Sequence, residues 1–307
     1  MLIPKSFLLS PDDLKNIRQA TLINDSMLWG DFAEDRIVEV KNAGTSHDAD
    51  IPVWIKVRDL VQPGCAGNVW RQLRDVIHTV TNQPLYAPMD VNHVKFMVRD
   101  DPSSTFTQLF RMTELTPNDR PMGMSEQIEI LCEAIETIRP AAILFVEYDE
   151  FDNGLLSYGT DPLWLVRFTM NYKPELPRIV SLRSSMMNGD LVPGVTYIAN
   201  YNDNSHLFAI DDKTNIILTN GEEPTIIRGL NGDESVTVCP IVVDSTRTIG
   251  AGDAFVAGFY LASLSGIDLR KSVEFGHLAS YSFIINSHDG LMGVVNWNEV
   301  FKAEKER

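Results

Sequence analysis

The stretch from Ser245 to Gly266, STRTIGAGDAFVAGFYLASLSG, constrains the fold of this chain more than any other segment. A Gly-Ala-Gly-Asp sequence at 250–253 is followed at once by apolar residues at helical spacing. This pattern predicts a tight loop that opens directly into a helix, and the free N–H groups of a helix N-terminus bind anions. A carboxylate at this place would repel a bound phosphate. Its presence is explained if its task is to take a proton from a group next to the phosphate. The loop therefore suggests phosphoryl transfer, with Asp253 as the base; the simpler alternative is an ordinary helix N-cap.

Composition sets the broad class of the protein. The chain has 307 residues, 44% of them hydrophobic, and a formal net charge of −16, which argues against nucleic acids and anionic membranes as partners. Its three cysteines are far apart, and the histidines are isolated, so neither a metal site nor a disulfide framework is indicated. With no signal peptide and no apolar run of about 20 residues, we expect a cytoplasmic protein.

Segments that read as strands and helices alternate along the chain, which predicts a mostly parallel, doubly wound α/β sheet flanked by helices. The expected strands lie at 18–25, 141–148, 178–183, 196–200 and 215–221, and the expected helices at 67–80, 124–138 and 268–286. Ligands of such sheets bind beyond the carboxyl ends of the strands. The polar residues expected at those ends are Asp25, Tyr148, Arg183, Asn200 and Gly221.

Further strands are expected outside the main sheet, within residues 31–60 and on both sides of the turn DPSS at 101–104. There is no internal repeat and no Pro/Gly/Ser-rich linker. We therefore expect one domain over residues 1–307.

Two separate motifs resemble those of the ribokinase-like (PfkB) carbohydrate kinases. GAGDAFVAGF at 250–259 is similar to the C-terminal signature of that family, and PGCAGNVWRQL at 63–73 is similar to its N-terminal motif. Segments 94–100, 107–114 and 147–157 look like those of one branch, the heptose-phosphate kinases of lipopolysaccharide precursor synthesis. The resemblance extends over about residues 18–297, and two motifs in the right order are far more specific than one.

The resemblance implies a ribokinase-like fold with a small β-lid, here near 31–60 and 93–115, over the sugar pocket. It implies ATP as the phosphoryl donor and Mg²⁺ as a bridge between phosphates. Its catalytic positions match Asp253 as general base and Gly250, Ala251 and Gly252 as the anion hole. Its substrate positions match, or lie near, the following residues: Asp25 or its rival Asp31, Gly64, Gly67, Asn68, Lys95 and Arg111.

The resemblance also indicates a nucleotide side of the site. Asn200 and Asp203 are similar to an Asn-x-x-Glu motif near the phosphates, and Thr219 and Gly221 belong to a nucleotide-side strand. Arg183 stands where the branch has a lysine. Turns, helix caps and surface charges are the ordinary alternatives for the substrate-side and nucleotide-side residues.

The chain departs from the family pattern at several positions. Arg247 stands near a monovalent-cation site of many members, and we hypothesise that its guanidinium replaces K⁺; Asp244 could instead keep the acidic role. Pro224 replaces a glycine of the nucleotide-side strand and removes an N–H donor.

These features together predict an ATP-dependent kinase that phosphorylates a hydroxyl of a sugar or sugar phosphate. A heptose-phosphate-like substrate is favoured, followed by another small sugar or a nucleoside. One alternative is a kinase-fold protein that has lost efficient turnover and acts in ligand binding or regulation. Another is an assembly protein whose lid forms a subunit interface, and a homodimer through the lid is possible in either case.

Overall fold

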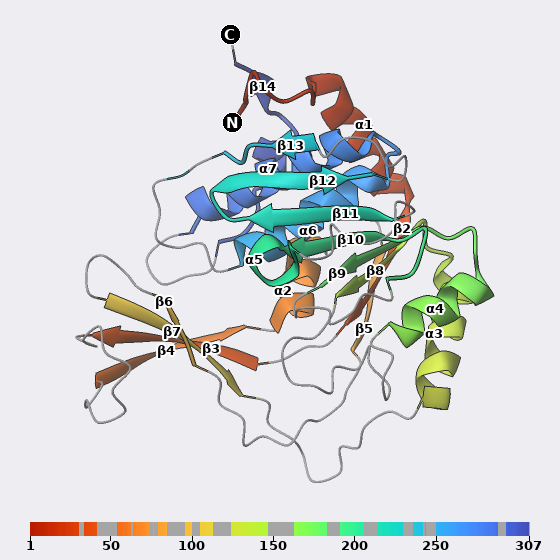
Figure 1. Cartoon of the computed structure of the whole chain (residues 1–307), viewed down its shortest axis with the longest axis horizontal. Helices are drawn as coiled ribbons and strands as arrows, with labels where there is room; N and C mark the ends of the chain where they lie inside the picture. Colours follow the sequence, from red (N-terminus) through yellow and green to blue (C-terminus); the bar gives the residue numbers. More distant parts are fainter. Residues whose placement is uncertain are drawn as a thin grey trace.

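The fold was analysed in a computed structural model of the chain (Figure 1). The structure describes the backbone of residues 1–30, 34–41, 54–62, 64–73, 76, 79–84, 96–99, 105–112, 124–146, 163–182, 191–205, 214–229, 236–241, 243, 250–287 and 293–306. All structural statements below refer to these residues.

The main sheet has eight strands in the order β13-β12-β11-β10-β9-β8-β2-β5. The six strands from β11 to β5 run parallel to one another, whereas β12 and β13 pair antiparallel at one edge. Their bounds are β2 (Asp25–Gly30), β5 (Thr79–Pro84), β8 (Ile143–Val146), β9 (Arg178–Ser181), β10 (Thr196–Asn200), β11 (Asn215–Asn220), β12 (Glu223–Arg228) and β13 (Val236–Val238). The expected parallel α/β sheet is confirmed.

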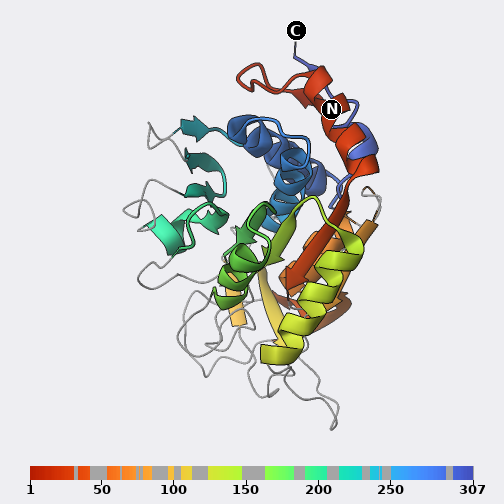
Figure 2. The ribbon, with the colours of Figure 1, turned by 90° about the vertical axis from the view of Figure 1, so that its right-hand side faces the viewer.

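Helices cover both faces of this sheet (Figure 2). Successive strand residues point to opposite faces, so Leu28 and Leu144 join one core while Met27 and Ile143 join the other. The first core is shared with α1 (Pro11–Ile23), α2 (Gly64–Leu73), α6 (Ala251–Ser263), α7 (Leu269–Ile285) and α8 (Trp297–Val300). The second is shared with α3 (Met124–Ile138) and α4 (Trp164–Tyr172).

A second, four-stranded antiparallel sheet lies apart from the main sheet, at the lower left of Figure 1. Its order is β4-β3-β7-β6, and its strands are β3 (Glu34–Lys41), β4 (Trp54–Gln62), β6 (Phe96–Arg99) and β7 (Thr105–Met112). The strands expected within 31–60 and around the DPSS turn thus form one sheet. Its role as a lid stays a prediction.

The N-terminal elements differ from the sequence prediction. The strand expected at 18–25 is wrong, because residues up to Ile23 form α1 and the strand β2 begins only at Asp25. The helix starts with a capping box, in which Ser10 and Asp13 satisfy each other's backbone N–H groups. The helix expected at 67–80 begins earlier and ends at Leu73, and strand β5 takes up its last two residues.

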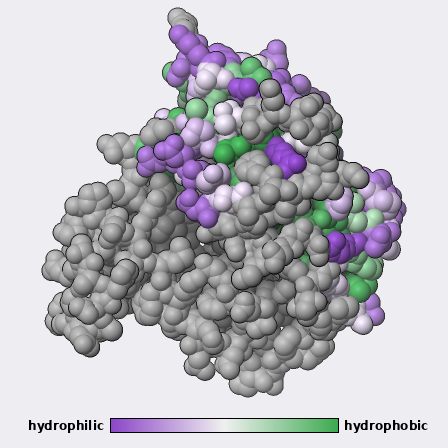
Figure 3. All heavy atoms as spheres, in the orientation of Figure 1, coloured by the Kyte–Doolittle hydropathy of each residue, from purple (hydrophilic) through white to green (hydrophobic). Residues whose placement is uncertain are grey.

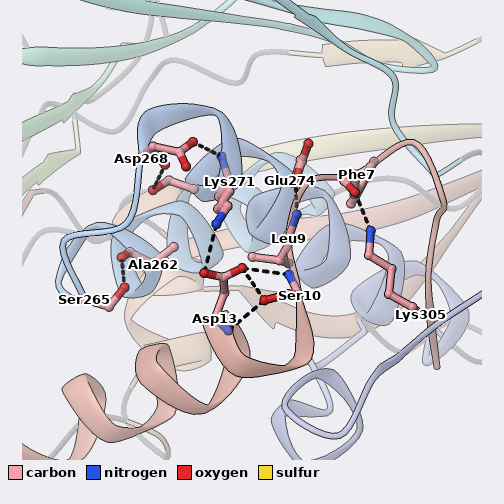
Figure 4. Close-up of polar contacts among 11 residues, drawn as sticks. Phe7, Leu9, Ser10, Asp13, Ala262, Ser265, Asp268, Lys271, Glu274 and Lys305 are labelled. Atoms are coloured by element: carbon pink, nitrogen blue, oxygen red, sulfur yellow. Dashed lines mark hydrogen bonds and ion pairs between the residues drawn. The ribbon is translucent and has the colours of Figure 1, made fainter.

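The two ends of the chain are joined to each other and to α7 (Figure 4). The strand β1 (Leu2–Ile3) pairs in parallel with β14 (Glu304–Lys305). Asp13 forms an ion pair of 3.1 Å with Lys271, and the buried carboxylate of Glu274 accepts the N–H of Leu9 at 2.7 Å. Hydrophilic residues gather on the described surface around these ends (Figure 3). None of the described helices could span a bilayer.

His277 of α7 is buried in the first core, where its ring meets that of Phe255 at 5.1 Å. Burial lowers the pKa of His277 from 6.5 to about 4. Because the unfolded chain binds the proton more tightly, stability is lost as the pH falls from 6.5 towards 4, by about 3 kcal/mol in total. We expect urea unfolding of a His277→Leu variant to show a correspondingly weaker pH dependence over this window. Equal pH dependence in the two proteins would contradict this.

Candidate functional site

The direction of α6 places its N-terminus at the carboxyl edge of the main sheet. Near the other end of the helix, the hydroxyl of Tyr260 donates to the carbonyl of Ala142, just before β8, at 2.8 Å. Asn24, just before β2, donates to the carbonyl of Leu264 at 3.5 Å. The C-terminal end of α6 therefore lies at the amino ends of the strands. Asp253, in the first turn, lies towards the carboxyl edge, where ligands of such sheets bind.

The loop before α6 has the backbone of an anion-binding turn. Gly250 is the N-cap and has a left-handed backbone, with φ of 89°, which glycine adopts without strain. The first intrahelical hydrogen bond runs from the N–H of Ala254 to the carbonyl of Gly250 at 3.0 Å. The N–H groups of Ala251 and Gly252 precede that bond. A Cβ atom at Gly252 would meet no heavy atom within 4 Å, so the space beside this turn is open.

Asp253 and Asn68 bring the two sequence motifs into direct contact. The side-chain amide of Asn68, in α2, donates to the Asp253 carboxylate at 3.0 Å across 185 positions of sequence. Both residues are about 4% exposed. The amide oxygen of Asn68 is buried and has no hydrogen-bond partner among the described residues. A buried acceptor without a hydrogen bond destabilises the folded protein, unless a ligand donates a hydrogen bond to it.

Gly64 and Gly67 lie in the first turn of α2, immediately before Asn68. Since α2 packs against α6, this turn and the 250–253 loop face one region of the molecule. The substrate-side prediction for Gly64 and Gly67 is thus consistent in position, although their contacts with a sugar stay a prediction.

Ser280 is a residue of this region that the sequence analysis missed. Its hydroxyl, in α7, donates to the carbonyl of Ala251 at 2.8 Å and so fixes the start of α6. The contact depends on a close approach of the two helices. A Cβ atom at Gly258 would lie 2.6 Å from the Cβ of Ala279, and one at Gly276 would lie 2.8 Å from the ring of Phe255. Gly258 and Gly276 are a sequence signal for a close approach of two helices, but they do not identify Ser280 as the residue that contacts Ala251.

Three residues predicted to lie on the nucleotide side are close together at the carboxyl edge of the sheet. Asn200 ends β10 and caps the short helix α5 (Tyr201–Asn204), and Thr219 pairs with it on β11. The Thr219 hydroxyl donates to the carbonyl of Ala199 at 3.2 Å. Gly221 follows with φ of 61°. Asp203 lies in α5, but its side chain is outside the described residues.

Pro224 lies in β12, opposite a break in the register of β11 between Leu218 and Asn220. Proline occurs in strands at such bulges because it has no N–H to donate to the ladder. The structure thus accommodates the proline through the bulge.

Asp25 does not lie where its predicted role requires. It begins β2 instead of ending a strand, so it is at the amino edge of the sheet, with its carbonyl bound to the N–H of Ala141. The α6 helix separates the two edges by roughly 16 Å over the 11 residues from Asp253 to Leu264. The prediction that Asp25 ends the first strand is wrong. Its rival Asp31 follows directly after Gly30, the last residue of β2.

Several predicted site residues are outside the described part of the chain. These are Asp31, Lys95, Arg183 and Arg247, together with Tyr148 and the side chain of Arg111 in β7. Their roles stay predictions. Within the described ranges, no three His, Cys, Asp or Glu side chains gather as metal ligands would.

Comparisons with known proteins agree with this architecture. Residues 202–288 match the family model of the pfkB family carbohydrate kinases. An ATP-dependent 6-phosphofructokinase of Thermoanaerobacterium thermosaccharolyticum is 38% identical over 65 residues, which are 21% of this chain and 20% of that protein. The chain thus matches about a fifth of the length of its curated relatives.

Solved structures match over nearly the whole chain. A ribokinase of Arabidopsis thaliana, in complex with ribose and ATP, has a TM-score of 0.54 at 12% identity, with 91% of this chain and 99% of that chain covered. Phosphofructokinase-2 of Escherichia coli, in complex with potassium, has a TM-score of 0.56 at 13% identity over the same shares. At such identities the likeness shows the fold alone. The chain has the ribokinase-like α/β fold, and its residues 202–288 are similar to the pfkB family carbohydrate kinases.

Proposed function

We propose that this protein is an ATP-dependent kinase that phosphorylates a hydroxyl group of a small sugar or sugar phosphate. The observation that carries the proposal is the hydrogen bond between Asn68 and Asp253, because it joins the two motifs in one buried, polar site. A carboxylate at a helix N-terminus, beside N–H groups and open space, suits proton transfer next to a phosphate.

Asp253 takes the proton of the acceptor hydroxyl. The amide of Asn68 holds one oxygen of the carboxylate at 3.0 Å and so fixes the orientation of the carboxylate for that proton transfer. The second polar atom of Asn68, its buried amide oxygen, accepts a hydrogen bond from another hydroxyl of the sugar. A polyol substrate satisfies both groups at once.

The N-terminal turn of α6 fits the phosphates of a nucleotide. Its N–H groups at Ala251 and Gly252 precede the first intrahelical hydrogen bond, and a Cβ atom at Gly252 would meet no heavy atom within 4 Å. The helix dipole adds a partial positive charge at this turn. ATP supplies the phosphoryl group when it is bound, and Mg²⁺ between its phosphates offsets their negative charge. Asn200, Thr219 and Gly221, at the carboxyl edge, are the described residues that we assign to the nucleotide side.

The substrate is assigned by class. The segments at 94–100, 107–114 and 147–157 resemble those of the heptose-phosphate kinases and favour a heptose-phosphate-like substrate. A curated relative named a 6-phosphofructokinase and another named an adenosine kinase make a hexose phosphate and a nucleoside the next candidates.

The test is ATP consumption, with Mg²⁺, across a panel of sugars, sugar phosphates and nucleosides, including heptose 7-phosphate, fructose 6-phosphate, ribose and adenosine. We expect turnover on one class, abolished when Asp253 is replaced. No turnover on any member, with ATP binding retained, would refute the kinase proposal and favour a binding or regulatory protein.

A Gly252→Ala variant should fold normally and bind ATP poorly. Its Cβ meets no neighbour, so we expect an unchanged melting temperature. The methyl group would occupy the space that we assign to a phosphate, and the KM for ATP should rise at least about tenfold, or about 1.4 kcal/mol. Gly229→Ala is the control, because its Cβ meets only the side-chain oxygen of Asn215 at 3.8 Å. An unchanged KM in the Gly252 variant would show that phosphate does not bind at this turn.

A further inference from the structure

A cavity of about 280 Å³ lies towards the amino edge of the main sheet, away from Asp253. Its walls come from the second half of α1, the last turn of α2 and the segment around α8. We call it the α1–α2 cavity, and the described residues that line it include Arg18, Leu22, Arg71, Gln72, Val294 and Trp297.

The wall of the α1–α2 cavity is held in place by hydrogen bonds. Gln72 is about 1% exposed, and its side-chain oxygen accepts the N–H of Val295 at 3.0 Å. The carbonyl of the same residue accepts the indole N–H of Trp297 at 2.7 Å. These bonds tie the end of α2 to the C-terminal segment, so the cavity is formed before any ligand arrives, as small-molecule sites usually are.

Among the described residues that line the cavity, two carry a positive charge and none carries a negative one. Arg18 is exposed and Arg71 is half-buried, and neither guanidinium forms an ion pair or a hydrogen bond with any described residue. The two guanidinium groups thus place positive charge at one cavity in a chain of net charge −16. Arginine pairs are well suited to phosphate and carboxylate groups.

The remaining walls are apolar and partly open to solvent. Leu22 is 59% exposed and Val294 is 40% exposed, whereas Trp297 is almost buried. Exposed apolar side chains beside two free cations fit a ligand that has both an apolar part and an anionic group. The volume is just below the roughly 300 Å³ at which pockets for drug-sized ligands begin, so the ligand is small.

We propose that the α1–α2 cavity binds a small organic anion, whose charged group pairs with Arg18 and Arg71 while its apolar body lies against Leu22, Val294 and Trp297. This site is separate from the one at Asp253, and the inference does not depend on the kinase proposal.

The test is calorimetric titration of the full chain with phenyl phosphate, benzoate, inorganic phosphate and benzyl alcohol. The first two probes distinguish a phosphate from a carboxylate as the charged group, and the last two carry only a charge or only an apolar body. We expect one of the first two to bind at least about tenfold more tightly than either of the last two. The Arg18→Met/Arg71→Met variant should lose that affinity at least about tenfold.

Lys15→Met is the matched control, because Lys15 is an exposed cation on α1 that does not line the cavity. It should leave the affinity within about twofold. A shift of the Trp297 indole N–H signal, assigned with a Trp297→Phe variant, should accompany binding. Equal affinity of the wild type and the double arginine variant, an unshifted indole signal at saturation, or no binding at about 10 mM would each overturn the proposal. Arg71→Met alone keeps the test decisive if the double variant does not fold.

Discussion

An Asp253→Asn variant should phosphorylate the accepted substrate about a thousandfold more slowly than the wild type, with little change in KM. General-base catalysis contributes roughly 10²–10⁴ in rate, and an amide cannot take the proton. The oxygen of the new Asn side chain can still accept a hydrogen bond from the amide of Asn68, as the carboxylate does at 3.0 Å in the wild type. The fold and the melting temperature should therefore be close to those of the wild type.

The matched control is Asp268→Asn. Asp268 is also a carboxylate at the start of a helix, but it is exposed and caps α7 by accepting the N–H of Lys271 at 2.9 Å. Its replacement should leave the rate within about twofold of the wild type, because it removes no group that we assign to the reaction. If the Asp253 variant kept more than about a tenth of the wild-type rate, the proton would have to leave by another route.

A Gly258→Ala variant should be less stable than the wild type by about 3 kcal/mol. This is the upper end of the usual destabilisation when an extra carbon is forced into a packed core. The new Cβ would lie 2.6 Å from the Cβ of Ala279 and 3.1 Å from the Cα of Gly276. The second contact is with backbone, so α6 and α7 must move apart. Because Ser280 anchors the start of α6 from α7, this separation should also lower the catalytic rate.

Urea unfolding at pH 7 measures this effect, and Gly229→Ala again serves as the control. Its Cβ makes an ordinary contact of 3.8 Å with Asn215, so it should change the free energy of unfolding by less than about 1 kcal/mol. Equal stability of the two variants would mean that the α6–α7 contact can relax without cost.

Local signals in the sequence were sufficient to predict the bounds of some helices and strands. The helix at 124–138 has the same bounds in the structure, because its apolar residues recur at helical spacing over its whole length. The first strand was misplaced because LIND at 22–25 looks like the end of a strand. Leu22 and Ile23 instead form the end of α1, whose N-cap, Ser10, lies 12 residues before Leu22.

The candidate site was predictable only in part. The resemblance gave Asp253 a catalytic role and Asn68 a substrate-side role, and the structure joins their side chains by a hydrogen bond of 3.0 Å, while the two roles stay predictions. The role of Ser280 was not predictable, since it depends on how closely two glycine-containing helices approach. The free arginines of the α1–α2 cavity have no sequence signature at all, because their common cavity arises from three distant segments.

The pairing of β1 with β14 has a consequence for synthesis on the ribosome. Leu2 and Ile3 are made some 300 residues before their partners Glu304 and Lys305. At about 5–20 residues per second, the N-terminal strand waits on the order of 15–60 s for its partner. During that time β1 has no partner in β14, so this pairing can form only after Lys305 has been made.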